Sequence, residues 1–98
     1  MIALSPEAEA QVDSLIAHFE ARGRIEAARN LLNALEKASH RIVSAPHAGL
    51  LAPRPYPSLK RQGRRWIIEE RYWISYSLTV PPVISGVFYV TPNIPNRL

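Results

Sequence analysis

Apolar residues recur every three or four positions through the first part of the chain. The first stripe consists of Ala8, Val12, Leu15, Ile16 and Phe19. This spacing predicts an amphipathic helix. Its start is favoured by the capping hydroxyl of Ser5, by a proline in the first turn, Pro6, and by the early carboxylate of Glu7. Its end is favoured by Arg22 and Gly23. The pattern predicts a helix over about residues 6–22.

A second amphipathic stripe follows almost at once. Its apolar positions are Ile25, Ala28, Leu32, Leu35 and Ile42, widened by Ala27, Leu31, Ala34 and Ala38. Ala45 and Pro46 end this helix, because the residue before a proline avoids helical geometry. The short connection predicts an antiparallel helical hairpin, whose apolar face must be covered by the rest of the chain.

The pattern changes beyond residue 60. Residues 64–68, 72–79 and 83–90 are rich in β-branched and aromatic side chains, which predicts three strands of a meander. Alternation in the middle strand places one set of side chains on a single face: Tyr72, Ile74, Tyr76 and Leu78. We expect that face to pack on the helices and the opposite face to be half polar. The last strand is apolar on both faces, which predicts a central position.

Three segments lie outside these elements. Residues 1–4 are apolar and predict a short extra strand, whereas the proline-rich residues 46–60 predict an extended, ordered strap. Residues 91–98 contain Pro92 and Pro95 and are expected to be irregular and exposed. The predicted fold is α+β in the order β-α-α-β-β-β, a single domain over residues 1–98. An N-terminal helical hairpin packs on a small antiparallel sheet of three to four strands.

Composition narrows the classes of function. The 98 residues are 47% hydrophobic, which suits one compact domain. The chain has no cysteine and its three histidines are far apart, so we expect no disulfide, no metal site and no cofactor. We also expect no membrane association and a cytoplasmic location, because the chain shows neither a signal-peptide start nor an apolar run of roughly 20 residues.

The charge distribution is uneven along the chain. Residues 1–45 carry five basic and six acidic groups (5 − 6 = −1), whereas residues 46–98 carry seven basic and two acidic groups (7 − 2 = +5). The basic half is expected to face an acidic partner, whether nucleic acid, ribosome or an acidic protein segment.

Three segments together resemble one protein family. They are the helix entry Leu4-Ser5-Pro6-Glu7-Ala8-Glu9-Ala10, the helix end and loop Ala45-Pro46-His47-Ala48-Gly49, and the strand Arg71-Tyr72-Trp73-Ile74-Ser75-Tyr76. In order and spacing they resemble the RelE/ParE toxin superfamily, and the resemblance covers most of the chain. It implies a helical hairpin on an antiparallel sheet and the toxin half of a type II toxin–antitoxin pair. It also implies a cognate acidic antitoxin and a hetero-oligomeric complex with it.

The superfamily has two branches that differ in chemistry. The RelE branch comprises ribosome-dependent mRNA endonucleases with a basic cluster on the sheet and a basic or aromatic tail, whereas the ParE branch poisons DNA gyrase. This chain has Ile68, Glu69 and Glu70 where the nucleases carry an essential arginine, and its tail, residues 91–98, holds one charge. No histidine lies in the sheet half to serve as a base, and arginine is a poor base at neutral pH.

These departures favour a ParE-like gyrase inhibitor without a catalytic residue. The alternatives are a RelE-type mRNA endonuclease and a degenerate toxin that binds only its antitoxin. The tail also lacks the His-x-Arg-Arg ending common among ParE relatives, so the resemblance supports the fold more strongly than it supports gyrase as the target.

The candidate residues for binding the target or the antitoxin are basic or aromatic. They are Arg61, Arg64, Arg65, Arg71, Trp73 and Arg97. The arginines have an alternative interpretation as a solvated strand edge that deters aggregation. Trp66 and Trp73 have an alternative interpretation as ordinary core residues. Tyr72 and Tyr76 are expected under the helices, and all three histidines on the surface.

Overall fold

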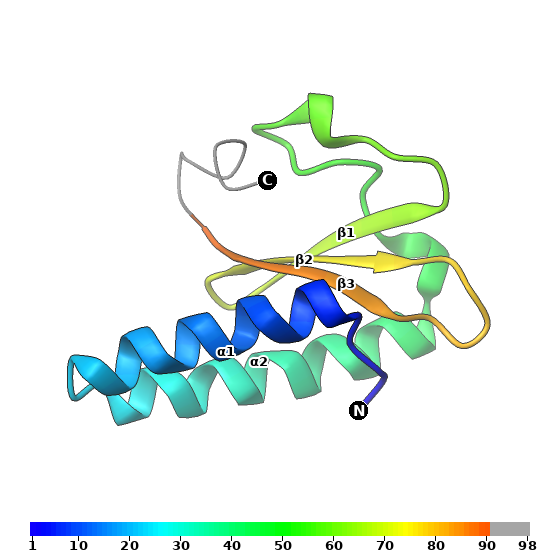
Figure 1. Cartoon of the computed structure of the whole chain (residues 1–98). Coiled ribbons are helices and arrows are strands. Elements are labelled where there is room, and N and C mark those ends of the chain that lie inside the picture. Colours follow the sequence, from blue (N-terminus) through cyan, green and yellow to red (C-terminus); the bar gives the residue numbers. More distant parts are fainter. Residues whose placement is uncertain (91–98) are drawn as a thin grey trace.

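The computed structural model describes residues 1–90 and has the predicted α+β architecture (Figure 1). Its elements in chain order are α1 (Pro6–Ala21), α2 (Ile25–Ser44), the short 3-10 helices η1 (Pro46–Ala48) and η2 (Pro57–Leu59), β1 (Arg64–Glu69), β2 (Tyr72–Ser77) and β3 (Ile84–Tyr89). Neither long helix is apolar enough over a sufficient length to cross a bilayer. The predictions made for residues 91–98 concern a segment that lies outside the described residues.

Local chemistry fixes the ends of α1. The hydroxyl of Ser5 accepts a hydrogen bond from the backbone N–H of Ala8 at 3.1 Å, and Pro6 occupies the first turn. Both features satisfy or remove amides that have no partner inside the helix. Gly23 lies between the two helices with a φ of +68°, a conformation that glycine adopts without strain. The chain therefore reverses direction within a few residues, and the predicted hairpin is confirmed.

The sheet is an antiparallel meander in which β2 is the central strand. The order is β1-β2-β3, with Ile67 opposite Ile74 and Ile74 opposite Val87. The prediction that the last strand is central is wrong. β3 is apolar on both faces because both faces are covered: Val87 belongs to the helix-side core and Phe88 to a second cluster on the other side.

Two apolar clusters lie on opposite faces of the sheet. The helix-side core includes Tyr72, Ile74 and Tyr76, which confirms the predicted inner face of β2. The second cluster consists of Leu59, Trp66, Trp73 and Phe88, with Leu50 and Tyr56 packed against it.

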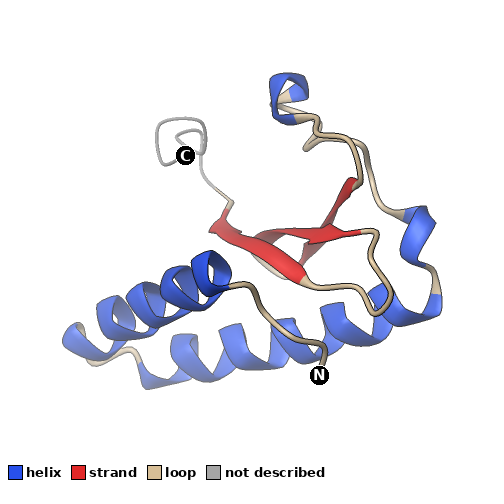
Figure 2. Cartoon of the chain, turned by 45° about the vertical axis from the view of Figure 1, so that its right-hand side comes forward, coloured by secondary structure: helices blue, strands red, loops and turns tan. Residues whose placement is uncertain are grey.

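The predicted strap supplies the cover for this second face. Residues 46–60 run over it (Figure 2). Leu50 and Trp66 exchange two backbone hydrogen bonds, each of 2.7 Å, which attach the strap to the outer edge of β1. The opposite face of β2 carries Trp73, Ser75 and Ser77 and is thus half polar, as predicted, with Trp73 and Ser75 buried beneath this cover.

Two sequence predictions on the helical side need correction. Residues 1–4 form no regular strand: Leu4 makes a single parallel bridge to Ile84 at the outer edge of β3. Ile25 and Leu32 were placed in the apolar stripe of α2, yet their side chains are 65% and 50% exposed. The buried face of α2 is made of Leu31, Ala34, Leu35, Ala38, Ser39 and Ile42. Ile25 and Leu32 lie off this arc, so neither α1 nor the sheet reaches them.

Gly49 is the tightest point of the strap, and a methyl group there should destabilise the fold. Its backbone is extended (φ −68°, ψ 160°), so alanine fits the dihedral angles. A Cβ atom would nevertheless meet the Tyr76 hydroxyl and lie 2.9 Å from the Cβ of Arg65. We expect Gly49→Ala to lower the free energy of unfolding by about 1–3 kcal/mol in urea denaturation. The Tyr76→Phe background, which lacks the clashing hydroxyl, should reduce that loss. An equal loss in both backgrounds would contradict the steric cause.

Candidate functional site

The structure separates the predicted site residues into two regions. Arg61 and Arg64 lie together at the start of β1, on the strap side of the sheet, where both line one cavity. Arg65 follows Arg64 in the strand and so points to the other face. Arg71 lies at the far end of β1, in the turn to β2.

The two remaining predicted residues lie elsewhere. Trp73 is buried, with 4% of its surface exposed, so the core interpretation of this residue is confirmed and its side chain is not on the accessible surface. Trp66 is likewise buried, at 1%. Arg97 lies outside the described residues.

We call the cavity beside Arg61 and Arg64 the strap cavity. Its volume is about 220 Å³, and it is lined by Glu7, Gln11, Leu59, Arg61, Arg64, Trp66, Ser75, Ser85 and Phe88. α1 supplies the first two of these, η2 and the loop after it the next two, and the three strands the rest. The hydroxyls of Ser75 and Ser85 are 2.9 Å apart, which joins β2 to β3 at the back of the cavity.

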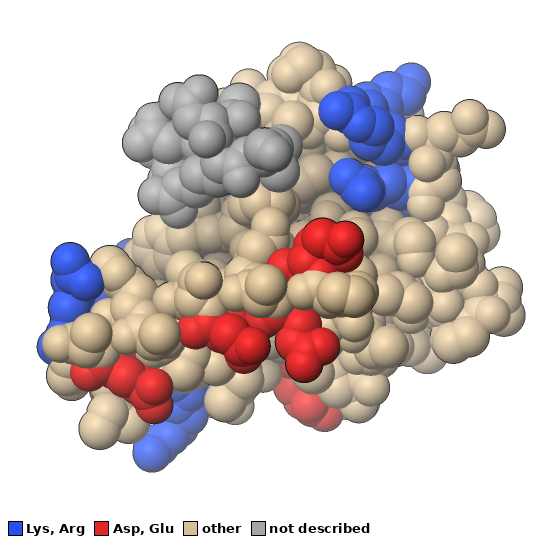
Figure 3. Space-filling view, in the orientation of Figure 1, with Lys and Arg blue, Asp and Glu red and all other residues tan. Residues whose placement is uncertain are grey.

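Neither arginine of the strap cavity forms an ion pair with a carboxylate of residues 1–90, although Glu7 lines the same cavity. Both carboxylates of the sheet half are held by α2: Glu69 by Arg41 at 2.9 Å and Glu70 by Lys37 at 2.8 Å. No carboxylate of residues 1–90 lies within ion-pairing distance of a lysine or arginine of residues 46–90. Basic side chains accordingly gather where the strap meets β1, whereas acidic ones lie along α1 (Figure 3). The strap side therefore carries one of the basic patches of the described chain.

One buried polar atom lies beneath this region. The indole Nε1 of Trp66 has no hydrogen-bond partner, and it is the one such side-chain atom in the described part of the chain. An unsatisfied buried donor costs on the order of 1–3 kcal/mol. The strap side thus contains a local defect in an otherwise well-packed cluster.

The two tyrosines on the helix side of β2 make the fold sensitive to alkaline pH. Burial raises the pKa of Tyr72 and of Tyr76 above the usual value for a phenol, although nearby arginines oppose the shift. A free phenol ionises at about pH 10, whereas the buried phenols of the folded chain ionise at a higher pH. In the interval between these two values the unfolded chain holds fewer protons than the folded one. The contribution of the two tyrosines to the free energy of unfolding should therefore be fully present below about pH 9 and should fall as the pH rises above about 10.

Urea unfolding between pH 8 and pH 11 measures this loss. The Tyr72→Phe and Tyr76→Phe variants should each lose less stability over that interval than the natural chain. An identical pH profile in all three proteins would show that other groups cause the alkaline transition.

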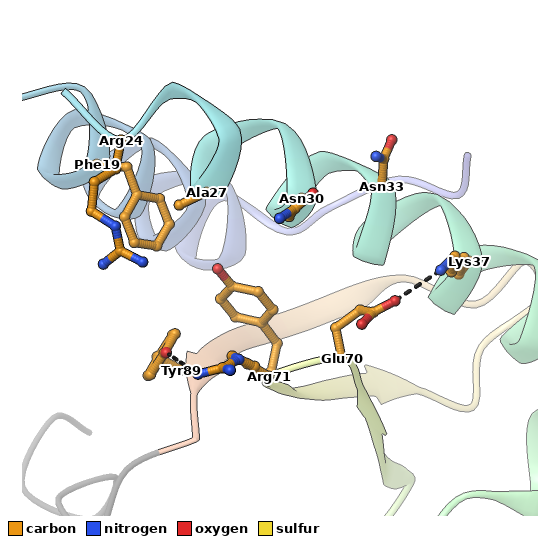
Figure 4. A pocket seen from close by; sticks show the side chains of 10 residues that line it. Phe19, Arg24, Ala27, Asn30, Asn33, Lys37, Glu70, Arg71 and Tyr89 are labelled. Carbon is orange, nitrogen blue, oxygen red and sulfur yellow. Dashed lines mark hydrogen bonds and ion pairs between the residues drawn. The ribbon is translucent and has the colours of Figure 1, made fainter.

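A second cavity lies between the helices and the β1–β2 turn, and we call it the hairpin cavity. Its volume is about 430 Å³, and it is lined by Phe19, Arg24, Ala27, Asn30, Asn33, Lys37, Glu70, Arg71, Tyr72 and Tyr89 (Figure 4). Of these, Arg71 was a candidate predicted from the sequence. Arg24, Asn30 and Asn33 were missed, although the two asparagines lie three residues apart and so share one face of α2.

The histidines do not belong to either cavity. His18, His40 and His47 are exposed on α1, α2 and η1, which confirms the sequence prediction. Within residues 1–90 no group of three histidine or carboxylate side chains is arranged to hold a metal ion. Searches against protein-family models and against curated proteins give no match to this sequence.

Proposed function

We propose that this protein is the toxin of a type II toxin–antitoxin pair, of the RelE/ParE kind and closer to the ParE branch. The observation that carries the proposal is the uncompensated basic surface of the strap side, presented by a helical hairpin on a three-stranded antiparallel meander. That architecture agrees with the fold that the sequence resemblance implies. A surface with several unpaired arginines is suited to an acidic macromolecular target.

The chemistry of the strap cavity favours inhibition by binding over cleavage of RNA. Cleavage needs a group that takes the proton of the 2′-hydroxyl, cations for the phosphorane and an acid for the leaving oxygen. Arg61 and Arg64 supply charge, but the three histidines lie elsewhere. DNA gyrase is therefore the target we propose, and the arginines are contact residues.

One observation supports the alternative of a ribosome-dependent mRNA endonuclease. Folding brings Glu7 of α1 into the same cavity as Arg61 and Arg64, which lie more than fifty residues away in sequence. A carboxylate is able to act as a general base towards a 2′-hydroxyl. Glu7 was not among the residues predicted from the sequence, because a base was expected from the sheet half and Glu7 belongs to α1.

The antitoxin is proposed to be an acidic segment that folds on binding. Both outer edges of the sheet are already engaged: Trp66 of β1 pairs with the strap, and the backbone N–H of Val87 in β3 donates to the side chain of Gln11 at 2.8 Å. Addition of a full strand is thus hindered at either edge. A helix that rests on the basic strap side is the better match.

Purified protein separates the two candidate functions. Gyrase supercoiling assays and translation extracts with a defined message should be run with the natural chain and with Glu7→Gln. Inhibited supercoiling with an intact message, unchanged in Glu7→Gln, supports the gyrase proposal. Message cleavage that is lost in Glu7→Gln would replace that proposal with the endonuclease. Neither effect in either assay would count against both.

A further inference from the structure

The hairpin cavity has the features of a binding site that is independent of the strap side. Residues on its helical side come from the end of α1, the turn that follows it and α2, and those on its sheet side come from the β1–β2 turn, the start of β2 and the end of β3. Its volume of about 430 Å³ falls within the range of small-molecule sites, roughly 300–1,000 Å³. It shares no lining residue with the strap cavity.

Two guanidinium groups approach this cavity from opposite sides. Figure 4 shows Arg24 extending from the helical side towards the sheet side, where Arg71 and Tyr89 lie. Arg24 is placed over the ring of Phe19, 5.5 Å from its centroid, and Arg71 donates a hydrogen bond to the Tyr89 hydroxyl at 3.5 Å. Neither arginine has a carboxylate partner among residues 1–90.

Tyr72 is a buried phenol that lines the same cavity as both cations and is 4% exposed. Burial and the neighbouring Tyr89 raise the pKa of its hydroxyl, whereas Arg24 and Arg71 act in the opposite direction. Two cations therefore line one cavity, one from the helical side and one from the sheet side. The one carboxylate that lines the cavity, Glu70, is already neutralised by Lys37 at 2.8 Å.

The other walls are suited to a group attached to the anion. The rings of Tyr72 and Tyr89 meet edge to face with their centroids 5.6 Å apart, which fixes the orientation of both. Asn30 and Asn33 contribute amide groups from α2, and each amide both donates and accepts hydrogen bonds. Phe19 and Ala27 supply an apolar surface.

We propose that the hairpin cavity binds a small phosphate monoester, with its phosphate held between Arg24 and Arg71. Two guanidiniums from separate elements offer donors in two planes, which match the several oxygens of a tetrahedral dianion better than the two oxygens of one carboxylate. The attached group, of about mononucleotide size, then lies against Tyr89 and the two asparagines. This site does not depend on the proposed toxin function, since it shares no residue with the surface assigned to the target.

Calorimetric titration of the full chain tests the site with defined probes. AMP and inorganic phosphate are the ligands, adenosine is the control that lacks the phosphate, and sulfate at equal ionic strength is the control for general anion binding. We expect AMP to bind more tightly than adenosine and sulfate. The Arg24→Gln and Arg71→Gln variants should each raise the dissociation constant for AMP about 10- to 100-fold, the range expected for loss of a hydrogen bond from a charged group.

A matched variant and a second measurement complete the test. Arg54→Gln removes the same charge from an exposed site on the strap and should leave AMP binding unchanged. In the natural chain, AMP should shift the ring resonances of Tyr72 and Tyr89 in NMR spectra. Binding of inorganic phosphate with the same arginine dependence would also support the site. The proposal is overturned if adenosine or sulfate binds as well as AMP, if Arg54→Gln weakens binding as much as Arg71→Gln, or if the tyrosine resonances do not move.

Discussion

Replacement of both Arg61 and Arg64 by glutamine is expected to abolish the growth inhibition that we propose for this protein. The two side chains line the strap cavity, and neither forms an ion pair with a carboxylate of the described chain. Loss of both charges should weaken binding to an acidic target or antitoxin by at least about tenfold, since buried charge pairs at interfaces carry several kcal/mol. Stability should change little, because Arg61 donates hydrogen bonds to nearby backbone carbonyls alone.

The matched control removes two charges from the helical side. Arg22→Gln with Arg29→Gln lowers the net charge equally, at exposed positions of the α1–α2 turn and of α2. This control should remain toxic and should bind the antitoxin normally. Equal loss of toxicity in both double variants would show that net charge, and not the strap side, determines activity.

The Trp66→Ala variant is expected to lose about 3–5 kcal/mol of unfolding free energy, the range for deletion of a large buried aromatic side chain. Trp66 is 1% exposed, packs 5.8 Å from Phe88 between ring centroids, and belongs to the segment of β1 that pairs with the strap. Its removal leaves a cavity under the strap. Urea denaturation followed by far-ultraviolet circular dichroism measures the loss.

Two companions make the stability experiment specific. Trp66→Phe should cost less than Trp66→Ala, because it retains an aromatic ring and eliminates the indole N–H that has no partner. Ile68→Ala lies on the same strand at a position that is 40% exposed and should cost under about 1 kcal/mol. A Trp66→Ala protein as stable as Ile68→Ala would contradict the packing of the strap on the sheet.

The elements of the fold could be predicted because their signals are local. Ser5 and Pro6 mark the start of α1, Gly23 the reversal, and Pro46 the end of α2, so the predicted bounds agree with the structure within a residue or two. The alternation of Tyr72, Ile74 and Tyr76 likewise identified the face that packs on the helices. Each of these signals depends on residues close together in sequence.

The site could be predicted less well because its geometry depends on distant residues. Arg71 is close in sequence to Arg64, but the length of β1 separates them, so the basic cluster expected from composition is divided between two cavities. Alternation along a strand would have shown that Arg64 and Arg65 face opposite ways. In contrast, no local pattern indicates that Glu7 joins Arg61, or that Arg24 faces Arg71, because both pairs form only when the hairpin docks on the sheet.

The central proposal is that this chain is a toxin that acts through its strap side. The most direct test is controlled expression in bacteria, with and without a co-expressed candidate acidic antitoxin, while viable counts, the DNA-damage response and message integrity are followed. We predict growth arrest with damage signalling and intact messages, relieved by a cognate antitoxin and absent in the Arg61→Gln, Arg64→Gln double variant. Normal growth of cells that accumulate the folded natural chain would contradict it.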